Sequence, residues 1–320
     1  MEATEQRILA IDIGGTKLAV GVVDGEGRVL ENLRGATPRA SVPDGGELIL
    51  RTLLNLVGEL KTDPAEFVGV GVGCGGPMRW PQGEVSPLNI EDWRGFPLRA
   101  RLAEEFAGRP VRVHNDAICV AIAEHWRGAG QGVDEMLGMV VSTGVGGGLI
   151  LGGRLVDGRS GNAGHIGHAI VHENEPECVC GSIGCLEAIA SGPRLTGWAA
   201  DQGWRPGVPA DQRTGRELVA DAQRGHPIAL SALNRAGRAL GLAITSATLL
   251  CDLEVVAIGG GLSQAGPLLF DPLEATLRER IGLEFARSVR VVPAAFGQES
   301  GLVGAAALIV HPERYWSPND

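Results

Sequence analysis

Two segments of the chain share one pattern, in which a buried strand runs into a glycine-rich turn and the chain leaves that turn as a second strand. The first segment spans residues 7–23 around Gly14-Gly15, and the second spans 136–151 around Thr143–Gly148. Short apolar runs bounded by glycine are typical of strands buried in a sheet. The repetition therefore predicts two similar halves that face one cleft.

The rest of the chain predicts alternating strands and helices. The expected strands are 7–13, 18–23, 28–34, 67–73, 111–116, 136–142, 149–153, 254–262 and 288–292, and the expected helices are 46–60, 117–127, 214–223, 229–250, 266–281 and 300–310. A hairpin meander followed by alternating helices and strands indicates mixed α/β layers. Residues 201–213 are the clearest candidate for an exposed loop.

Charge and composition exclude several classes of partner. The net charge is -10 at pH 7, which argues against non-specific binding to nucleic acid or to an anionic membrane. No apolar run approaches the length of a membrane span, and the acidic start MEATEQRILAIDIGG lacks a signal-peptide pattern. Six cysteines in 320 residues do not form a disulfide framework. We therefore expect a cytoplasmic protein.

Three cysteines and one histidine fall within eighteen residues, at His168, Cys178, Cys180 and Cys185. Three thiolates and one imidazole form a closed tetrahedral zinc set, with no ligand position left for water. Such a site stiffens a loop instead of performing chemistry. The residues beside it, namely His165, His168 and Glu187, are then candidates for binding a ligand.

The first glycine turn, within Asp12–Lys17, carries the groups that a phosphate site needs. Backbone amides beside adjacent glycines can point at a phosphate, and Thr16 and Lys17 add a hydroxyl and a cation. Asp12 at the strand end is suited to hold magnesium, directly or through water. The alternative is an ordinary β-turn with a surface lysine, and this motif alone does not decide between them.

Two further glycine turns follow strands, at 142–148 and at Gly259-Gly260-Gly261. Each is weak evidence by itself, because glycine turns are common. The third stands at a strand-to-helix junction, where a helix N-terminus favours an anion or a flat ring close to the backbone. Three glycine turns at strand ends, two of them copies of each other, are stronger evidence together than separately.

Asn115 and Asp116 end one predicted strand and begin a helix. Both residue types cap helices well, so a purely structural role is one interpretation. The other is that Asp116 is a general base for a substrate hydroxyl and Asn115 positions that substrate. Phosphoryl transfer requires little more than in-line geometry, a metal on the phosphates and such a carboxylate.

With these motifs, the chain resembles the ROK family (repressors, open reading frames and kinases) of bacterial sugar kinases along nearly its whole length. The most specific part is GNAGHIGHAIVHENEPECVCGSIGCLEAIASG, residues 161–192. The resemblance implies an α/β, two-domain actin-like ATPase fold, related to ribonuclease H, with the active site between the domains. It also implies ATP, magnesium and structural zinc, transfer of the γ-phosphoryl group to a hexose hydroxyl, usually at C6, and a homodimer or homotetramer.

We expect an N-terminal α/β domain of residues 1–118, onto which the terminal helix 300–320 packs back. Residues 119–299 form the C-terminal α/β domain, which carries the zinc loop. The positions that match the family's motifs are Asp12, Gly14, Gly15, Thr16, Lys17, Thr143, Gly144, Gly259, Gly260 and Gly261 for ATP and magnesium, Gly76, Asn89, Asn115, Asp116, His165, His168 and Glu187 for the sugar, and His168, Cys178, Cys180 and Cys185 for zinc.

In this resemblance Asp116 matches the catalytic base, and Glu187 matches an acceptor of sugar hydroxyl protons. His168 would both bind zinc and donate toward the sugar, so that the metal fixes its tautomer and ring plane.

One position departs from the family's glucokinases. Most of them carry Glu where this chain has His165. A neutral histidine accepts one proton and can donate another, which could suit the carbonyl of a 2-acetamido group. The string Ala-Gly-His-Ile-Gly-His resembles bacterial N-acetylmannosamine kinases more than strict glucokinases. Lineage drift with glucose still accepted is an equal alternative, so both glucose and an N-acyl-hexosamine such as N-acetylmannosamine stay open as substrates.

Some ROK proteins are sugar-responsive transcriptional regulators that carry a DNA-binding domain before the first glycine turn. Here only eleven residues precede Asp12, and no basic recognition helix is present. A sugar sensor without kinase activity is the other alternative. Against it, Asp12, Thr16, Lys17 and Asp116 are all present. We therefore expect a kinase acting on a small sugar and ATP, with no nucleic-acid or membrane partner.

Overall fold

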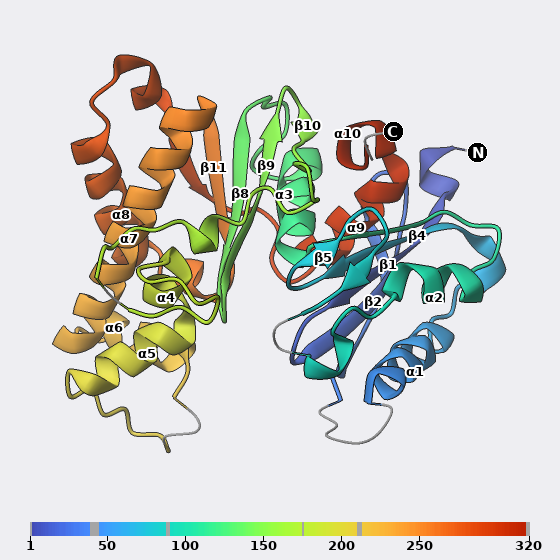
Figure 1. Cartoon of the computed structure of the whole chain (residues 1–320), viewed down its shortest axis with the longest axis horizontal. Helices are drawn as coiled ribbons and strands as arrows, with labels where there is room; N and C mark the ends of the chain where they lie inside the picture. Colours follow the sequence, from blue (N-terminus) through green and yellow to red (C-terminus); the bar gives the residue numbers. More distant parts are fainter. Residues whose placement is uncertain (1, 39–44, 88–89, 175, 210–212, 318–320) are drawn as a thin grey trace. The chain divides into compact units, whose positions relative to one another are not determined.

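The computed structural model describes residues 2–38, 45–87, 90–174, 176–209 and 213–317. The chain forms two compact units. Unit 1 comprises Met1–Gln131, Gly148–Ala163 and Gln298–Asp320, and unit 2 comprises Gly132–Gly147 and Gly164–Gly297. Each combines helices with strands of a mixed sheet, which confirms the expected α/β class (Figure 1).

Unit 1 contains the first sheet and the helices that cover it. Its strands are β1 (Arg7–Ile13), β2 (Lys17–Val23), β3 (Val29–Ala36), β4 (Phe67–Cys74) and β7 (Val111–His114), with the small hairpin β5 (Met78–Arg79) and β6 (Glu84–Val85) and the short strand β10 (Arg154–Leu155). Its helices are α1 (Gly45–Gly58), α2 (Leu98–Glu105), α3 (Asp116–Arg127), α9 (Ser300–Val310) and α10 (Pro312–Tyr315).

The first sheet has the order β3-β2-β1-β4-β7. The strands β1, β2 and β3 are antiparallel neighbours, whereas β1, β4 and β7 run parallel. A row of small residues crosses it at Gly21, Ala10 and Gly71. A Cβ atom at Gly21 would lie 3.0 Å from Leu302 of α9, and one at Gly71 would overlap the Ala305 carbonyl. The small row therefore allows α9 to pack directly on β1 and β4.

Unit 2 is built on three parallel strands and a layer of helices. The elements are β8 (Met136–Val141), α4 (Leu186–Ala190), α5 (Gly192–Asp201), α6 (Gly215–Gln223), α7 (Pro227–Cys251), β11 (Val255–Gly259), α8 (Pro267–Arg280) and β12 (Arg290–Pro293). The helices α7 and α8 lie side by side (Figure 1), and a Cβ atom at Gly237 of α7 would be 2.6 Å from the Leu269 carbonyl oxygen. The strand β9 (Val145–Leu151) leads from unit 2 into unit 1.

The second sheet has the order β10-β9-β8-β11-β12. It repeats the first, since three strands that are consecutive in the chain are followed by two parallel ones. This shared order confirms the predicted repetition of the strand–turn–strand unit.

The structure corrects the second glycine turn. The sequence predicts a turn from Thr143 to Gly148, but β9 already begins at Val145. A Cβ atom at Gly147 would lie 2.8 Å from the Gly138 carbonyl oxygen and 3.0 Å from Ile166. The glycines after Gly144 therefore permit close packing of an extended strand and do not form a turn.

The division of the chain also differs from the expected boundary at residue 118. That boundary falls inside α3, and the whole helix belongs to unit 1, as do residues 148–163. The reason is packing within unit 1, because α3 contacts α9 so closely that a Cβ atom at Gly304 would overlap the Cys119 carbonyl. The sequence prediction also left out α2, α4, α5 and the β5–β6 hairpin.

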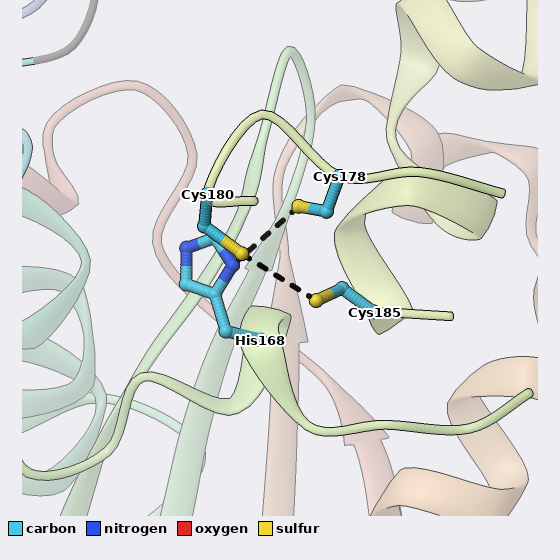
Figure 2. A group of neighbouring side chains, drawn as sticks. All are labelled: His168, Cys178, Cys180 and Cys185. Carbon is cyan, nitrogen blue, oxygen red and sulfur yellow. Dashed lines mark hydrogen bonds between the residues drawn. The ribbon is translucent and has the colours of Figure 1, made fainter. Parts of the chain in front are cut away.

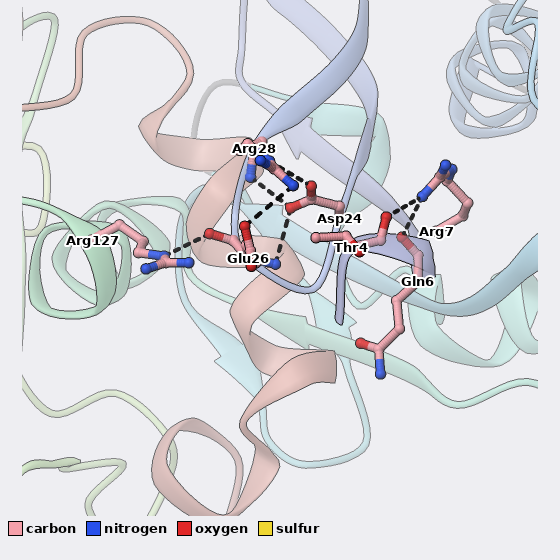
Figure 3. A network of polar contacts seen from close by, with 7 residues as sticks. All are labelled: Thr4, Gln6, Arg7, Asp24, Glu26, Arg28 and Arg127. Atoms are coloured by element: carbon pink, nitrogen blue, oxygen red, sulfur yellow. Dashed lines mark hydrogen bonds and ion pairs between the residues drawn. The ribbon is translucent and has the colours of Figure 1, made fainter. Parts of the chain in front are cut away.

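A polar network fixes the turn between β2 and β3 (Figure 3). The buried Asp24 carboxylate accepts the backbone amides of Glu26 and Arg28 at 2.9 Å and the Arg28 guanidinium at 2.8 Å. Arg127 of α3 donates to the Glu26 carbonyl. Burial alone would raise the pKa of Asp24, but these donors hold it below its ordinary value. The network therefore stabilises the folded state at pH values above the ordinary pKa of aspartate. This stabilisation is lost as the pH falls through the lowered pKa of Asp24.

Among the described helices, none combines the length and apolarity needed to cross a membrane.

Candidate active site

Three parallel strands of unit 1 end at one edge of the first sheet. Asp12 in β1 pairs with Gly73 in β4, and Gly73 pairs with His114 in β7. The residues that follow the last two strands, Gly75-Gly76 and Asn115-Asp116, therefore reach the same edge as Asp12. Ligands of α/β proteins commonly bind at the carboxyl ends of parallel strands.

Asn115 caps α3 and holds Asp116 at its first turn. The Asn115 Oδ1 atom accepts the amide of Ala117 at 3.0 Å, and its Nδ2 donates to the Gly76 carbonyl at 3.2 Å. Asp116 is half-buried and accepts the Ala117 amide at 2.8 Å. A Cβ atom at Gly75 would lie 3.2 Å from Asp116 Oδ2, so glycine leaves room in front of the carboxylate. The structure therefore contains the helix cap that was one interpretation of this pair.

The carboxylates of Asp12 and Asp116 both have raised pKa values. The pKa of Asp12 is raised from 3.8 to about 6, mainly by burial and then by the Asp116 charge, against the lowering effects of Lys17 and Arg34. Burial also raises the pKa of Asp116, against the opposing effect of the Ala117 amide. Two carboxylates with raised pKa values therefore lie at one edge of the sheet. Such a pair suits the binding of a divalent cation by one carboxylate and the acceptance of a proton by the other.

The carboxylate of Asp12 lies against the first turn of α9. A Cβ atom at Gly301 would be 2.8 Å from both Cγ and Oδ2 of Asp12. Glycine at this position therefore permits the carboxylate to approach the helix N-terminus, whose dipole favours a negative charge. Nothing in the sequence marks Gly301 as a site residue, because a glycine inside a predicted helix gives no indication of what it contacts.

Replacing Gly301 with Ala is expected to displace the Asp12 carboxylate. The Mg²⁺ concentration needed for half-maximal activity should therefore rise. The matched control is Gly197→Ala in α5, where nothing lies within 4 Å of the added Cβ. There we expect a gain in unfolding free energy of about 0.5–1 kcal/mol from helix propensity. Thermal unfolding and a Mg²⁺ titration of both variants measure this, and a Gly301→Ala protein with an unchanged Mg²⁺ dependence contradicts the assigned contact.

The first glycine turn joins β1 to β2 beside Asp12. The Gly14 amide donates to the Lys17 carbonyl at 2.9 Å, and the buried Thr37 hydroxyl donates to the Gly14 carbonyl at 2.7 Å. In the part of the chain that the structure describes, the amides of Gly15 and Thr16 have no hydrogen-bond acceptor. The turn thus presents two unused amides next to the hydroxyl of Thr16 and the side chain of Lys17. Thr37 is a supporting residue that sequence reasoning missed.

In unit 2, Glu187 ties the second glycine turn to α4. Its Oε2 atom accepts the Val145 amide at 2.9 Å, and a Cβ atom at Gly144 would lie 2.8 Å from the same oxygen. Within the described residues, Oε1 accepts no hydrogen bond. One oxygen of Glu187 is therefore structural, and the other is available to a ligand beside Thr143-Gly144.

The two histidines of the predicted sugar site form one short helical turn, Ile166–His168 with His165 as its cap. Their rings are nearly parallel, with centroids 6.4 Å apart. A Cβ atom at Gly167 would overlap the Val145 carbonyl, so only glycine lets this turn pack against the start of β9. Val145 thus contacts both Glu187 and the histidine turn, and unit 2 brings its predicted sugar-binding residues together.

The predicted metal ligands converge, as Figure 2 shows. The Sγ atoms of Cys180 and Cys185 are 3.7 Å apart, as are Cys178 Sγ and His168 Nδ1. All four ligand atoms lie within 4.8 Å of one another. Zinc–sulfur bonds of about 2.3 Å in a tetrahedral site place two sulfurs about 3.8 Å apart. The donor set and its spacing therefore fit tetrahedral zinc, with His168 turned so that Nδ1 faces the sulfurs.

The third glycine turn lies beside the second. Gly260 has a φ of 93°, and a Cβ atom there would be 2.4 Å from the Val141 carbonyl oxygen. A Cβ atom at Gly261 would lie 3.8 Å from the Ser142 hydroxyl oxygen. Because β8 and β11 are parallel neighbours, both turns leave the same edge of the second sheet.

The predicted site residues thus fall into two sets. Unit 1 brings together Asp12, Gly14, Gly15, Thr16, Lys17, Gly76, Asn115 and Asp116, and unit 2 brings together Thr143, Gly144, His165, His168, Glu187, Gly259, Gly260 and Gly261 with the three cysteines. Asn89 lies outside the described residues. Arg34 is a charged neighbour of Asp12 that was missed, since the sequence predicts the hairpin of β2 and β3 but not the register that places Arg34 opposite Ala19.

Comparison with known proteins identifies the family. A model described as the ROK family matches residues 8–311. A glucokinase of Thermotoga maritima is 33% identical over 315 residues, which cover 95% of this chain and 97% of that protein. An N-acetylmannosamine kinase of Citrobacter koseri is 35% identical over 304 residues, which cover 94% of this chain and 97% of that protein.

A solved structure shows the same fold. The ROK family glucokinase from Streptomyces griseus, in complex with glucose and AMPPNP, matches with a TM-score of 0.81 at 34% identity, covering 94% of this chain and 98% of that one. These matches extend over nearly the full length of the chain. This chain belongs to the ROK family.

Proposed function

We propose that this protein is an ATP-dependent sugar kinase, which transfers the γ-phosphoryl group to a hexose hydroxyl, at C6. The observation that carries the proposal is the position of Asp116, held at the edge of the first sheet beside Asp12 and next to a glycine turn with unused amides. Phosphoryl transfer needs a proton acceptor, a metal ligand and phosphate donors close together. The matches to glucokinases and an N-acetylmannosamine kinase support the same reaction.

Each set of residues has a role in this reaction. Asp116 accepts the proton of the attacking hydroxyl, while Asn115 and Gly76 orient the sugar. Asp12 would hold a magnesium ion, and the chemistry that such an ion would supply is the neutralisation of charge on the phosphates. The remaining assignments are Gly14, Gly15, Thr16, Lys17, Thr143 and Gly144 to the phosphates, Gly259, Gly260 and Gly261 to the adenosine, and His165, His168 and Glu187 to sugar hydroxyls. Both sets serve one transfer, in an actin-like fold whose two sheets share one strand order.

The metal cluster supports the sugar site. We assign structural zinc to His168, Cys178, Cys180 and Cys185, because the spacing of their ligand atoms fits a tetrahedral site. With Nδ1 on the metal side, the proton of a neutral His168 stays on Nε2, which can donate to a sugar oxygen. Bound at these four residues, zinc would fix the direction of that donor.

Replacing Cys180 with Ser is expected to remove stoichiometric zinc and raise the KM for the sugar more than the KM for ATP. The reason is that the loop holding His168 and Glu187 loses its cross-link, while the glycine turn of unit 1 is untouched. Metal analysis and steady-state kinetics measure both effects. Cys251→Ser, which alters a thiol of α7 outside the cluster, is the control. A purified wild-type protein without zinc contradicts the metal assignment.

The sugar is glucose or an N-acyl-hexosamine such as N-acetylmannosamine, and His165 stands at the position that separates them. A coupled ADP-release assay with MgATP and a panel of glucose, N-acetylmannosamine and N-acetylglucosamine tests the proposal. We expect ADP release that depends on one of these sugars. Tight sugar binding without ADP release contradicts the kinase proposal and favours a sensor or a regulator.

A further inference from the structure

A fully buried histidine lies immediately before Asn115 and Asp116. His114 is the last residue of β7 and has 0% of its surface exposed. Its Nδ1 atom accepts the backbone amide of Asn115 at 2.9 Å, and its Nε2 atom is 2.8 Å from Oδ1 of Asp157. Both ring nitrogens of His114 are therefore engaged, and one partner is the residue that caps α3.

These two contacts define the tautomer of His114. A backbone amide can only donate, so Nδ1 carries a lone pair and the ring proton is on Nε2. That proton is donated to the Asp157 carboxylate. A ring with its proton on Nδ1 would place two donors against each other at Asn115 and would leave Asp157 without its donor. Asp157 thus selects the form of His114 that can accept the Asn115 amide.

The ring of His114 is also confined sideways. Trp80 and Trp316 lie with ring centroids 6.1 Å and 6.2 Å from it, and Trp316 meets it edge-on at 90°. Asp157 is itself buried, at 8% exposed, and its carbonyl accepts the Ala163 amide at 3.1 Å. The acceptor for Asn115 is therefore held by packing on its sides and by a fixed carboxylate at its far nitrogen.

We propose that His114 and Asp157 are positioning residues for the phosphoryl transfer. The Asn115 amide bound to His114 Nδ1 sets the backbone at the start of α3, and so aims the Asn115 side chain and the Asp116 carboxylate. This inference rests on the proposed function, since it assigns a role in the reaction that Asp116 serves. His114 does not touch the reacting atoms and acts only through the two residues that follow it.

Two substitutions at His114 separate its contacts. In His114→Asn the side-chain oxygen lies near the former Nδ1 and can still accept the Asn115 amide, but it does not reach Asp157. In His114→Gln the longer amide reaches Asp157 and no longer meets the Asn115 amide. Each variant loses one buried hydrogen bond, so a merely structural role would affect both alike.

We expect His114→Gln to lower kcat by about tenfold to 100-fold, because a shift of about 1 Å in a reacting group has effects of that size. The KM for ATP should stay unchanged. His114→Asn should keep most of the wild-type kcat at a similar melting temperature. Equal loss of kcat in both variants, in step with their stability, overturns the inference, as does an unchanged kcat in His114→Gln.

A second readout does not depend on turnover. Amide hydrogen exchange at Asn115, followed by NMR, should be slow in the wild type and in His114→Asn and faster in His114→Gln. Ring ¹⁵N shifts should place the His114 proton on Nε2, and a proton on Nδ1 overturns the inference. A wild type with no activity on any sugar refutes the proposed function, whereas an active wild type with equally active variants refutes only the positioning role.

Discussion

Replacing Asp116 with Asn is expected to lower kcat by about 10²- to 10⁴-fold, the range that general-base groups contribute. Asparagine keeps the shape of the side chain and its oxygen can still accept the Ala117 amide, which Asp116 accepts at 2.8 Å. It cannot take the proton of the attacking hydroxyl. The KM for the sugar should therefore change little, and steady-state kinetics separate the two parameters.

The pH dependence gives a second test of the same assignment. Burial raises the pKa of Asp116, so the base is protonated up to a higher pH than a free aspartate. In the wild type, kcat should fall as the pH is lowered through this raised value, and the Asn variant should lack that acid limb. Asp134→Asn, an exposed carboxylate before β8, is the control. A kcat near that of the wild type in Asp116→Asn refutes the assignment.

Replacing Asp12 with Asn is expected to have opposite effects on activity and stability. Without the carboxylate, kcat should fall by roughly 10²- to 10³-fold, as when one preorganised electrostatic group is lost. The apoprotein should become more stable at pH 8, because a shift from 3.8 to about 6 in the pKa of Asp12 represents a cost of about 3 kcal/mol. Asparagine removes this cost.

The sign of the stability change is fixed by linkage. Between pH 3.8 and about 6 the folded protein holds a proton on Asp12 that the unfolded chain releases, so wild-type stability falls as the pH rises through this window. The advantage of Asp12→Asn should therefore be full at pH 8 and absent near pH 4. Mg²⁺ should stabilise the wild type and not the variant. Thermal unfolding of both proteins across this pH range measures the difference in their stability. A variant less stable than the wild type at pH 8 contradicts the assignment.

Much of the fold could be predicted because the strands are short apolar runs bounded by glycine. The strand 7–13 and the helix 300–310 match β1 and α9 residue for residue. Glycine itself misled the prediction at Gly146–Gly148, where the sequence does not distinguish a glycine that turns the chain from one that admits a neighbouring carbonyl. That distinction depends on the contacts of Gly147 with Gly138 and Ile166. No pattern in the sequence indicates these contacts.

The sequence predicted those site residues whose chemical role follows from the residue type itself. The four metal ligands are close in sequence and soft in character, so their convergence could be foreseen. Residues that act through a neighbour could not be predicted. Gly301 has its effect because it lacks a Cβ atom, which would meet the Asp12 carboxylate. His114 and Asp157 are hydrogen-bonded although they are 43 positions apart in the sequence. The expected homodimer or homotetramer stays a prediction.

The most direct test of the central claim is the stoichiometry of the products. Wild-type protein with MgATP and its preferred sugar should form ADP and sugar phosphate in a one-to-one ratio, with the new phosphate on C6 by ³¹P and ¹³C NMR. Asp116→Asn should form both products about 10²- to 10⁴-fold more slowly at the same protein concentration. ADP formed equally with and without sugar, or sugar phosphate formed at the wild-type rate by the Asn variant, would contradict the account.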